Sequence, residues 1–241
     1  MILWWTLLLL TTPFQDALRF ARYLDRQEDP YRAILEYRRA LFLLDRPDTT
    51  LHDSVLYRIA YLYEALEAPD RALQVLEEAW DTATAAWRFE RGRALFLMGL
   101  YPEARRAWQG RDTLVGWTYL RQHRFAEAAR YLGPLPPLPR KSPWLAAGLS
   151  AVVPGLGKMY AGHFWDGVFS LLLNGYTGWQ AYRSLRDHRP LAAPLYGGLF
   201  AFFYAGNVYG SYVAARQYNR TQVDLLVART EVRLNLWRYL P

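Results

Sequence analysis

The stretch PGLGKMYAGHFWDGVFSLLLNGYTGWQAYR, from Pro154 to Arg183, decides the fold predicted for the C-terminal part of this chain. It opens with closely spaced glycines and is continuously apolar or small between Val168 and Trp179. A second stretch, residues 190–215, contains no Asp, Glu, Lys or Arg. At a rise of about 1.5 Å per residue, a helix of that length can cross a hydrocarbon layer of about 30 Å. The pattern predicts a transmembrane helical hairpin.

Arginine dominates the loop between the two stretches, where RSLRDHR at 183–189 sets its arginines against the single Asp187. Short loops of this composition tend to face the cytoplasm. We therefore expect spans at about residues 164–182 and 191–215 in a bacterial inner membrane, with the preceding part of the chain on the periplasmic side. A buried pair of helices in a soluble protein is the alternative.

The closure of this hairpin can be predicted from its midpoint. Folding the chain back about the loop places Asp166 and Gly167 opposite Gly206 and Asn207. Gly206 and Gly210 form a small-xxx-small face that permits close backbone approach, and an asparagine can bond across helices. We expect these five residues to pack together, with glycine packing mattering at least as much as the amide. The alternative is that the glycine face serves a second copy in a homo-oligomer.

A family resemblance rests on the glycines of this stretch. PGLGKMYAG, with Pro154, Gly155, Gly157, Tyr160 and Gly162, resembles the opening of the small two-span bacterial membrane domains related to the TM2 group. The resemblance covers about the last hundred residues. It implies a membrane domain of residues 144–216 and no particular reaction, because such families mostly lack an assigned activity.

Residues 16–132 carry a repeated helical pattern. In each repeat an alanine follows an aromatic residue or proline by three places and precedes a large residue by four. The alanines are Ala33, Ala72, Ala104 and Ala128, and the large residues are Tyr37, Leu76, Trp108 and Leu132. Each is preceded by a helix with a small residue at the expected crossing, namely Ala21, Ala60, Gly92 and Gly116. The pattern resembles the tetratricopeptide repeat and predicts an all-α solenoid.

Stacked helix pairs generate a concave groove, so the repeats are expected to bind a protein partner. Polar positions on the first helices are candidates for the groove, and Arg58, Arg88 and Arg91 are placed to meet an acidic segment. Each of these arginines can also be merely solvated.

The remaining segments have simpler interpretations. Residues 1–15 contain a short apolar block typical of a signal peptide or an N-terminal anchor. The proline-rich residues 133–143 predict a stiff linker, and 144–153 a short helix in the membrane interface. If that helix crosses instead, the hairpin becomes a three-span domain. Residues 217–241 predict an amphipathic helix on the bilayer or against the repeats.

Composition narrows the partners and the chemistry. The net charge of +7 comes mostly from arginine beside apolar segments, which favours anionic lipid over nucleic acid. The chain has no cysteine, and of its four histidines only His163 stands at helical spacing from an acid, Asp166. That pair lacks further ligands for a metal. We expect no catalytic residues, no cofactor and no enzymatic activity.

The sequence therefore predicts an all-α envelope protein with helical repeats followed by a two-span hairpin. Its expected role is a membrane-anchored scaffold or assembly factor for other proteins. An oligomeric membrane-biogenesis or transport component, whose repeats recruit cargo, is the alternative.

Overall fold

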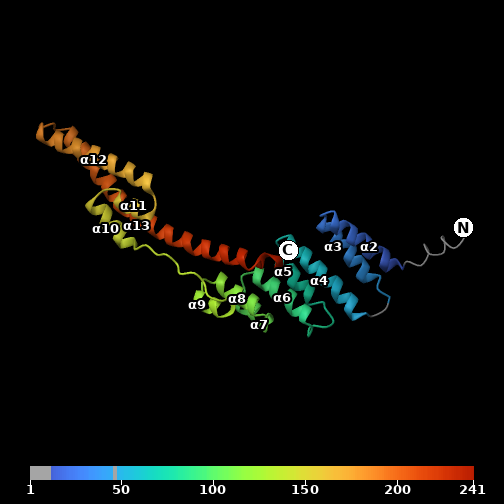
Figure 1. Ribbon diagram of the computed structural model, residues 1–241. Helices are drawn as coiled ribbons and strands as arrows, with labels where there is room; N and C mark the ends of the chain where they lie inside the picture. The colour runs from blue at the N-terminus through green and yellow to red at the C-terminus, as the bar shows by residue number, and fades with distance from the viewer. Residues whose placement is uncertain (1–11, 46–47) are drawn as a thin grey trace, which may run out of the picture. The chain divides into compact units, whose positions relative to one another are not determined.

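The computed structural model describes residues 12–45 and 48–241, which form helices and connecting turns without any strand (Figure 1). The all-α prediction is confirmed for this part of the chain. The chain divides into two compact units. Unit 1 comprises residues up to 135 together with 231–241, and unit 2 comprises residues 136–230.

Unit 1 is built from helical hairpins whose two helices lie side by side (Figure 1). In order, the pairs are α2 (Pro13–Arg26) with α3 (Pro30–Phe42), α4 (Thr49–Ala65) with α5 (Pro69–Leu76), α6 (Ala85–Leu97) with α7 (Tyr101–Ala107), and α8 (Asp112–Arg121) with α9 (Phe125–Leu132).

The same turn joins the two helices of each pair. A single residue with positive φ ends the first helix, and these residues are Glu28, Glu67, Gly99 and His123. The N–H of the next residue then donates to a carbonyl five positions back, at Leu24, Tyr63, Leu95 and Tyr119. This geometry is the Schellman motif, which satisfies the last carbonyls of a helix. The repeat is therefore present in the backbone as well as in the side-chain pattern.

Small residues allow the paired helices to touch. The repeat alanines Ala33, Ala72, Ala104 and Ala128 are all fully buried. A Cβ added to Gly92 would lie 2.3 Å from Trp108 Nε1, and one added to Gly116 would lie 2.7 Å from the Leu132 side chain. Large side chains on the second helices thus fill the space that the small crossing residues leave open.

Residues 231–241 complete unit 1. Leu236, in the 3₁₀ helix η1 (Leu236–Tyr239), is fully buried. Glu231 is buried too, and its Oε1 accepts a hydrogen bond of 2.7 Å from Trp117 Nε1 on α8. Trp237 packs edge-on against the same indole at 6.5 Å. The tail therefore covers the last hairpin, as capping elements of a helical array do.

Unit 2 follows a connection, residues 133–142, that forms no helix. It contains α10 (Pro143–Val152), α11 (Leu156–Ala161), α12 (Phe164–Arg186) and most of α13 (Ala192–Arg233). A Schellman turn with His188 at positive φ separates the last two helices.

The prediction of a transmembrane hairpin is wrong. Among the described residues, no helix has the length and apolarity needed to cross a membrane, so the spans expected at 164–182 and 191–215 are not supported. The error came from treating uncharged segments as apolar ones. Asn174, Gln180 and Asn207 interrupt the two segments, and their tyrosines and glycines add little hydrophobicity.

The signal peptide or N-terminal anchor expected at 1–15 falls mostly outside the described residues. At its end, Thr12 caps α2 by accepting a hydrogen bond from the Gln15 N–H, and the Gln15 side chain accepts from the Thr12 N–H. These two bonds form a capping box.

Candidate functional site

In unit 2, helix α12 buries small and polar side chains and exposes large apolar ones. The buried face of α12 consists of small or polar residues, namely Gly167, Ser170, Asn174, Thr177, Ala181 and Ser184. Its exposed residues are mostly large and apolar or aromatic, and they include Phe164, Trp165, Phe169, Leu172, Tyr176 and Trp179. Contiguous apolar surface of this kind marks an interaction site.

A polar network holds the interior of unit 2. Ser150 on α10 lies 2.7 Å from Ser211 Oγ on α13 and accepts a hydrogen bond of 2.9 Å from the Gly157 N–H. Asn207 donates to the Ser150 carbonyl oxygen at 3.4 Å, while Ser211 donates to the Asn207 carbonyl at 2.8 Å. Ser150, Ser211 and the Asn207 amide N–H are therefore bonded between α10 and α13, whereas the Oδ1 atom of Asn207 has no partner in the described chain.

The glycines of residues 154–162 allow the backbones of neighbouring helices to approach closely. Gly155, with φ of 91°, begins α11, and Gly162, with φ of 100°, ends it. A Cβ on Gly157 would lie 1.8 Å from the Ala146 carbonyl oxygen, and one on Gly155 would lie 2.0 Å from the Gly167 carbonyl oxygen. Only glycine fits such contacts.

Two further residues of the motif flank the short helix. Tyr160 OH accepts a hydrogen bond of 3.2 Å from the Ser142 N–H, and Pro154 precedes Gly155, the N-cap of α11. The predicted membrane motif is thus an architectural device of α10, α11 and α12.

The five residues expected to close the hairpin do not meet as one cluster. Gly167 has its nearest neighbours on α11, at Gly155 and Met159. Asn207 contacts Ser150 on α10, and a Cβ added to Gly210 would lie 3.3 Å from the Lys158 side chain.

The other two members of that set lie apart from it. A Cβ on Gly206 would meet nothing within 4 Å in the described chain. Asp166 is exposed and pairs with His163 at 3.4 Å. The insertion of α10 and α11 against α13 changes the packing that an isolated hairpin would have.

An apolar groove of about 560 Å³ runs between α10 and α13. Trp144 and Tyr212 meet edge-on at one end, with ring centroids 5.1 Å apart. At the other end, Tyr204 OH donates to the Ala151 carbonyl oxygen at 2.5 Å. The remaining lining residues are Ala147, Ala205, Val208 and Tyr209.

Arginines surround a hollow of about 390 Å³ among α2, α3 and α4 of unit 1. Leu18 and Val55 contribute buried apolar side chains to its lining. Arg22, Arg26 and Arg58 bring positive charge to it, against the single carboxylate of Asp25. The hollow therefore combines an excess of cations with an apolar floor.

Arg58 is fixed within this hollow. It donates to both carboxylate oxygens of Asp25, at 2.6 Å each, and stacks 4.6 Å from the Tyr61 ring centroid. Burial alone would raise the pKa of Asp25, but hydrogen bonds from Arg58 and Tyr37 outweigh it and lower that pKa. Burial, and then Asp25, raise the pKa of Tyr37 to about 12.

Arg22 and Arg26 lie on α2 at the same hollow. The Arg26 Nε donates to the Arg22 carbonyl oxygen at 3.3 Å, which orients the Arg26 side chain along its own helix. Neither guanidinium forms an ion pair with another described residue, so both remain able to bind an anion.

The other two predicted groove arginines lie outside the hollow. Arg91 stacks over the Trp87 ring at 5.4 Å, and Arg88 is exposed on α6. Sequence reasoning selected Arg58 and missed Arg22 and Arg26. Their spacing of four residues on the first helix, facing the same side, was the available signal.

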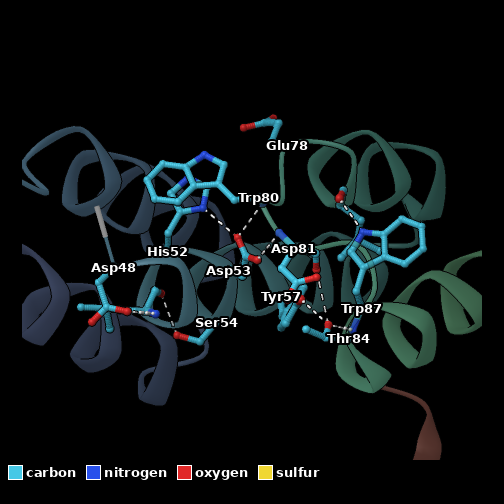
Figure 2. Close-up of polar contacts among 12 residues, drawn as sticks. Asp48, His52, Asp53, Ser54, Tyr57, Glu78, Trp80, Asp81, Thr84 and Trp87 are labelled. Atoms are coloured by element: carbon cyan, nitrogen blue, oxygen red, sulfur yellow. Dashed lines mark hydrogen bonds and ion pairs between the residues drawn. The ribbon is translucent and has the colours of Figure 1, made fainter. Parts of the chain in front are cut away.

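Besides Glu231, two buried acids serve structure in unit 1. Asp53 accepts hydrogen bonds from the N–H groups of Trp80 and Asp81, at 3.0 and 2.9 Å (Figure 2). Its other partner is His52, whose ring stacks on Trp80 at 3.8 Å. Burial acts to raise the pKa of Asp53, yet these three bonds outweigh it and lower the pKa. Asp53 thus secures the loop that follows the second hairpin.

Glu64 is the second buried acid, and it shares Arg93 with Glu90. Desolvation raises the pKa of Glu64 to about 7, although Arg93 opposes the shift. The pKa of Glu90 is raised for the same reasons. The cluster links α4 to α6 and lines none of the hollows described above.

Within the described residues, no group of three or more His, Asp or Glu is arranged to hold a metal. No family model, curated protein or solved structure matches the chain, so the function has to be inferred from these surfaces.

Proposed function

We propose that this protein is a scaffold or assembly factor whose helical repeats bind an acidic segment of a protein partner. The observation that carries the proposal is the arginine hollow, in which Arg22 and Arg26 have no ion-pair partner among the described residues and stand beside an apolar floor. Guanidinium groups recognise carboxylates bidentately and tolerate partial burial. An acidic side chain next to a hydrophobic one would satisfy both features of the hollow.

A binding measurement on the full chain tests this role. The probe is a fluorescent eight-residue peptide that alternates glutamate with leucine, and its anisotropy is followed during titration. Replacing Arg22 and Arg26 with glutamate should weaken binding by at least about a hundredfold, since each charge-assisted hydrogen bond contributes about 1.5–3 kcal/mol.

The matched control replaces Arg19 and Arg39 with glutamate, which changes the net charge equally outside the hollow. Arg19 lies on α2 and Arg39 on α3, and neither lines the hollow. Equal loss of affinity in both double variants would show that only net charge matters, and the proposed site would be abandoned.

Attachment to a lipid surface of the cell envelope is the second part of the proposal. It is supported by the inverted pattern of α12, which buries serine and asparagine and exposes tryptophan, phenylalanine and leucine. Arginines near such a surface favour anionic lipid. The full chain should float with vesicles of phosphatidylglycerol and phosphatidylethanolamine on a density gradient. Recovery at the bottom of the gradient would contradict this part.

A further inference from the structure

The groove between α10 and α13 has the polarity of an amphiphile along its length. Its lining residues on α13 span 204–212, a rise of about 12 Å. All of its lining residues lie in 144–153 and 190–215, which contain no Asp, Glu, Lys or Arg. One turn of α13 beyond the Tyr212 end stands a cation, Arg216.

Arg216 stands at that end, and Lys141 lies beside Tyr218, which does not line the groove. The Arg216 guanidinium lies 5.8 Å from the Tyr212 ring centroid, and Arg216 itself is exposed. Lys141 precedes Trp144 by three residues, and its Nζ lies 4.0 Å from the Tyr218 ring centroid. Lys141 is held there because its N–H and carbonyl oxygen each bond to Asn219 at 2.8 Å.

We propose that this groove binds one acyl chain of an anionic lipid, with the head group at Arg216. The inference rests on the lipid contact proposed above and makes it specific. The occupant is indicated by charge: a groove with an uncharged lining and a guanidinium against the tyrosine at one end matches a hydrocarbon chain that ends in a phosphate. Its volume falls within the roughly 300–1,000 Å³ of small-molecule sites. Its length also approaches the roughly 15 Å depth of half a hydrocarbon core.

The test uses the full chain and a lysophosphatidylglycerol with one diazirine-bearing dodecanoyl chain, kept below its micelle concentration. After illumination, labelled peptides are mapped by mass spectrometry. Labelling should be saturable and concentrated in residues 144–151 and 204–212. Labelling spread equally over the exposed side of α12, for example at Phe169 and Leu172, would show only adsorption and would overturn the proposal.

A pair of tryptophan substitutions sharpens the result. Ala205→Trp places an indole in the groove from an exposed position. It should reduce the labelling at least fivefold, which corresponds to a loss of about 1 kcal/mol of binding free energy. Ala201→Trp, one turn earlier, is exposed but does not line the groove, and should leave the labelling unchanged. Equal effects of the two variants would refute the assignment.

The head-group end is tested separately. Arg216→Gln should raise the dissociation constant for the anionic probe about tenfold and change that for a lysophosphatidylcholine probe much less. Arg229→Gln, also exposed on α13, is the control. If the protein floats with vesicles while neither probe labels the groove, the groove proposal fails and the lipid contact stands. If the groove is labelled saturably but the protein does not float, the groove proposal stands and the proposed attachment to a lipid surface fails.

Discussion

Replacing Gly157 with alanine tests whether close backbone approach holds unit 2 together. The added Cβ would lie 1.8 Å from the Ala146 carbonyl oxygen and 2.7 Å from Ser150 Oγ, whereas real Cβ contacts essentially never fall below 3.0 Å. Helices α10 and α11 must therefore move apart, which also weakens the 2.9 Å hydrogen bond from the Gly157 N–H to Ser150 Oγ.

The expected cost follows from three contributions. Overpacking costs about 1–3 kcal/mol, and the loss of the buried hydrogen bond costs about 1 kcal/mol. The higher helix propensity of alanine returns about 1 kcal/mol. We expect a net loss of about 2 kcal/mol, which corresponds to a roughly thirtyfold loss of protection against hydrogen exchange when the region opens locally.

Hydrogen–deuterium exchange of the full chain, read by mass spectrometry on peptides from α10 and α11, measures this effect directly. Gly148→Ala on α10 is the matched control, because its Cβ would meet nothing within 4 Å in the described chain. That variant should exchange as slowly as the parent protein or more slowly. Unchanged exchange in the Gly157 variant, or faster exchange in both variants, would refute the reasoning.

Three further predictions concern unit 1. The pKa of Glu64 is raised from 4.5 to about 7 in the folded protein. The stabilisation that protonated Glu64 contributes to the folded state is therefore complete below about pH 4.5 and is lost as the pH rises toward about 7. Chemical unfolding should show stability falling by up to about 1.4 kcal/mol per pH unit in that window, and Glu64→Gln should flatten the slope. Asp53→Ala should cost about 2–4 kcal/mol in the same assay by removing the charged acceptor of the Trp80 and Asp81 N–H groups, and Asp53→Asn should cost less. Glu231→Ala should release the C-terminal segment to limited proteolysis, whereas Glu231→Gln keeps an oxygen for Trp117 and should protect it.

The repeat register could be predicted from sequence because its signals are local. Each repeat alanine and crossing glycine lies within one hairpin, and a fixed spacing therefore reports a direct contact. Ala33 and Gly92 illustrate this, the first fully buried and the second in contact with Trp108. The Schellman turns could not be predicted in this way. Their positive-φ positions include Glu28 and Glu67, and glutamate is not a residue type typical of that backbone conformation.

Long-range contacts could not be read in the same way. Trp117 and Glu231 are 114 positions apart, and nothing near either residue in sequence indicates the other. Asn207 was assigned to Gly167 because the hairpin was considered alone, whereas α10 supplies its partner Ser150. The apolar groove was missed for the same reason, since its two walls lie 53 positions apart even where Tyr204 meets Ala151.

Unit 1 is discontinuous in the chain, because residues 136–230 are made between its hairpins and its covering segment. At about 5–20 residues per second, synthesis of that insertion takes on the order of 5–20 s. During this time the Trp117 indole on the nascent chain has neither its carboxylate acceptor nor the edge of Trp237. The last repeat therefore stays incomplete during this time, and the side of the Trp117 indole that Glu231 and Trp237 contact in the folded chain is open to binding by chaperones.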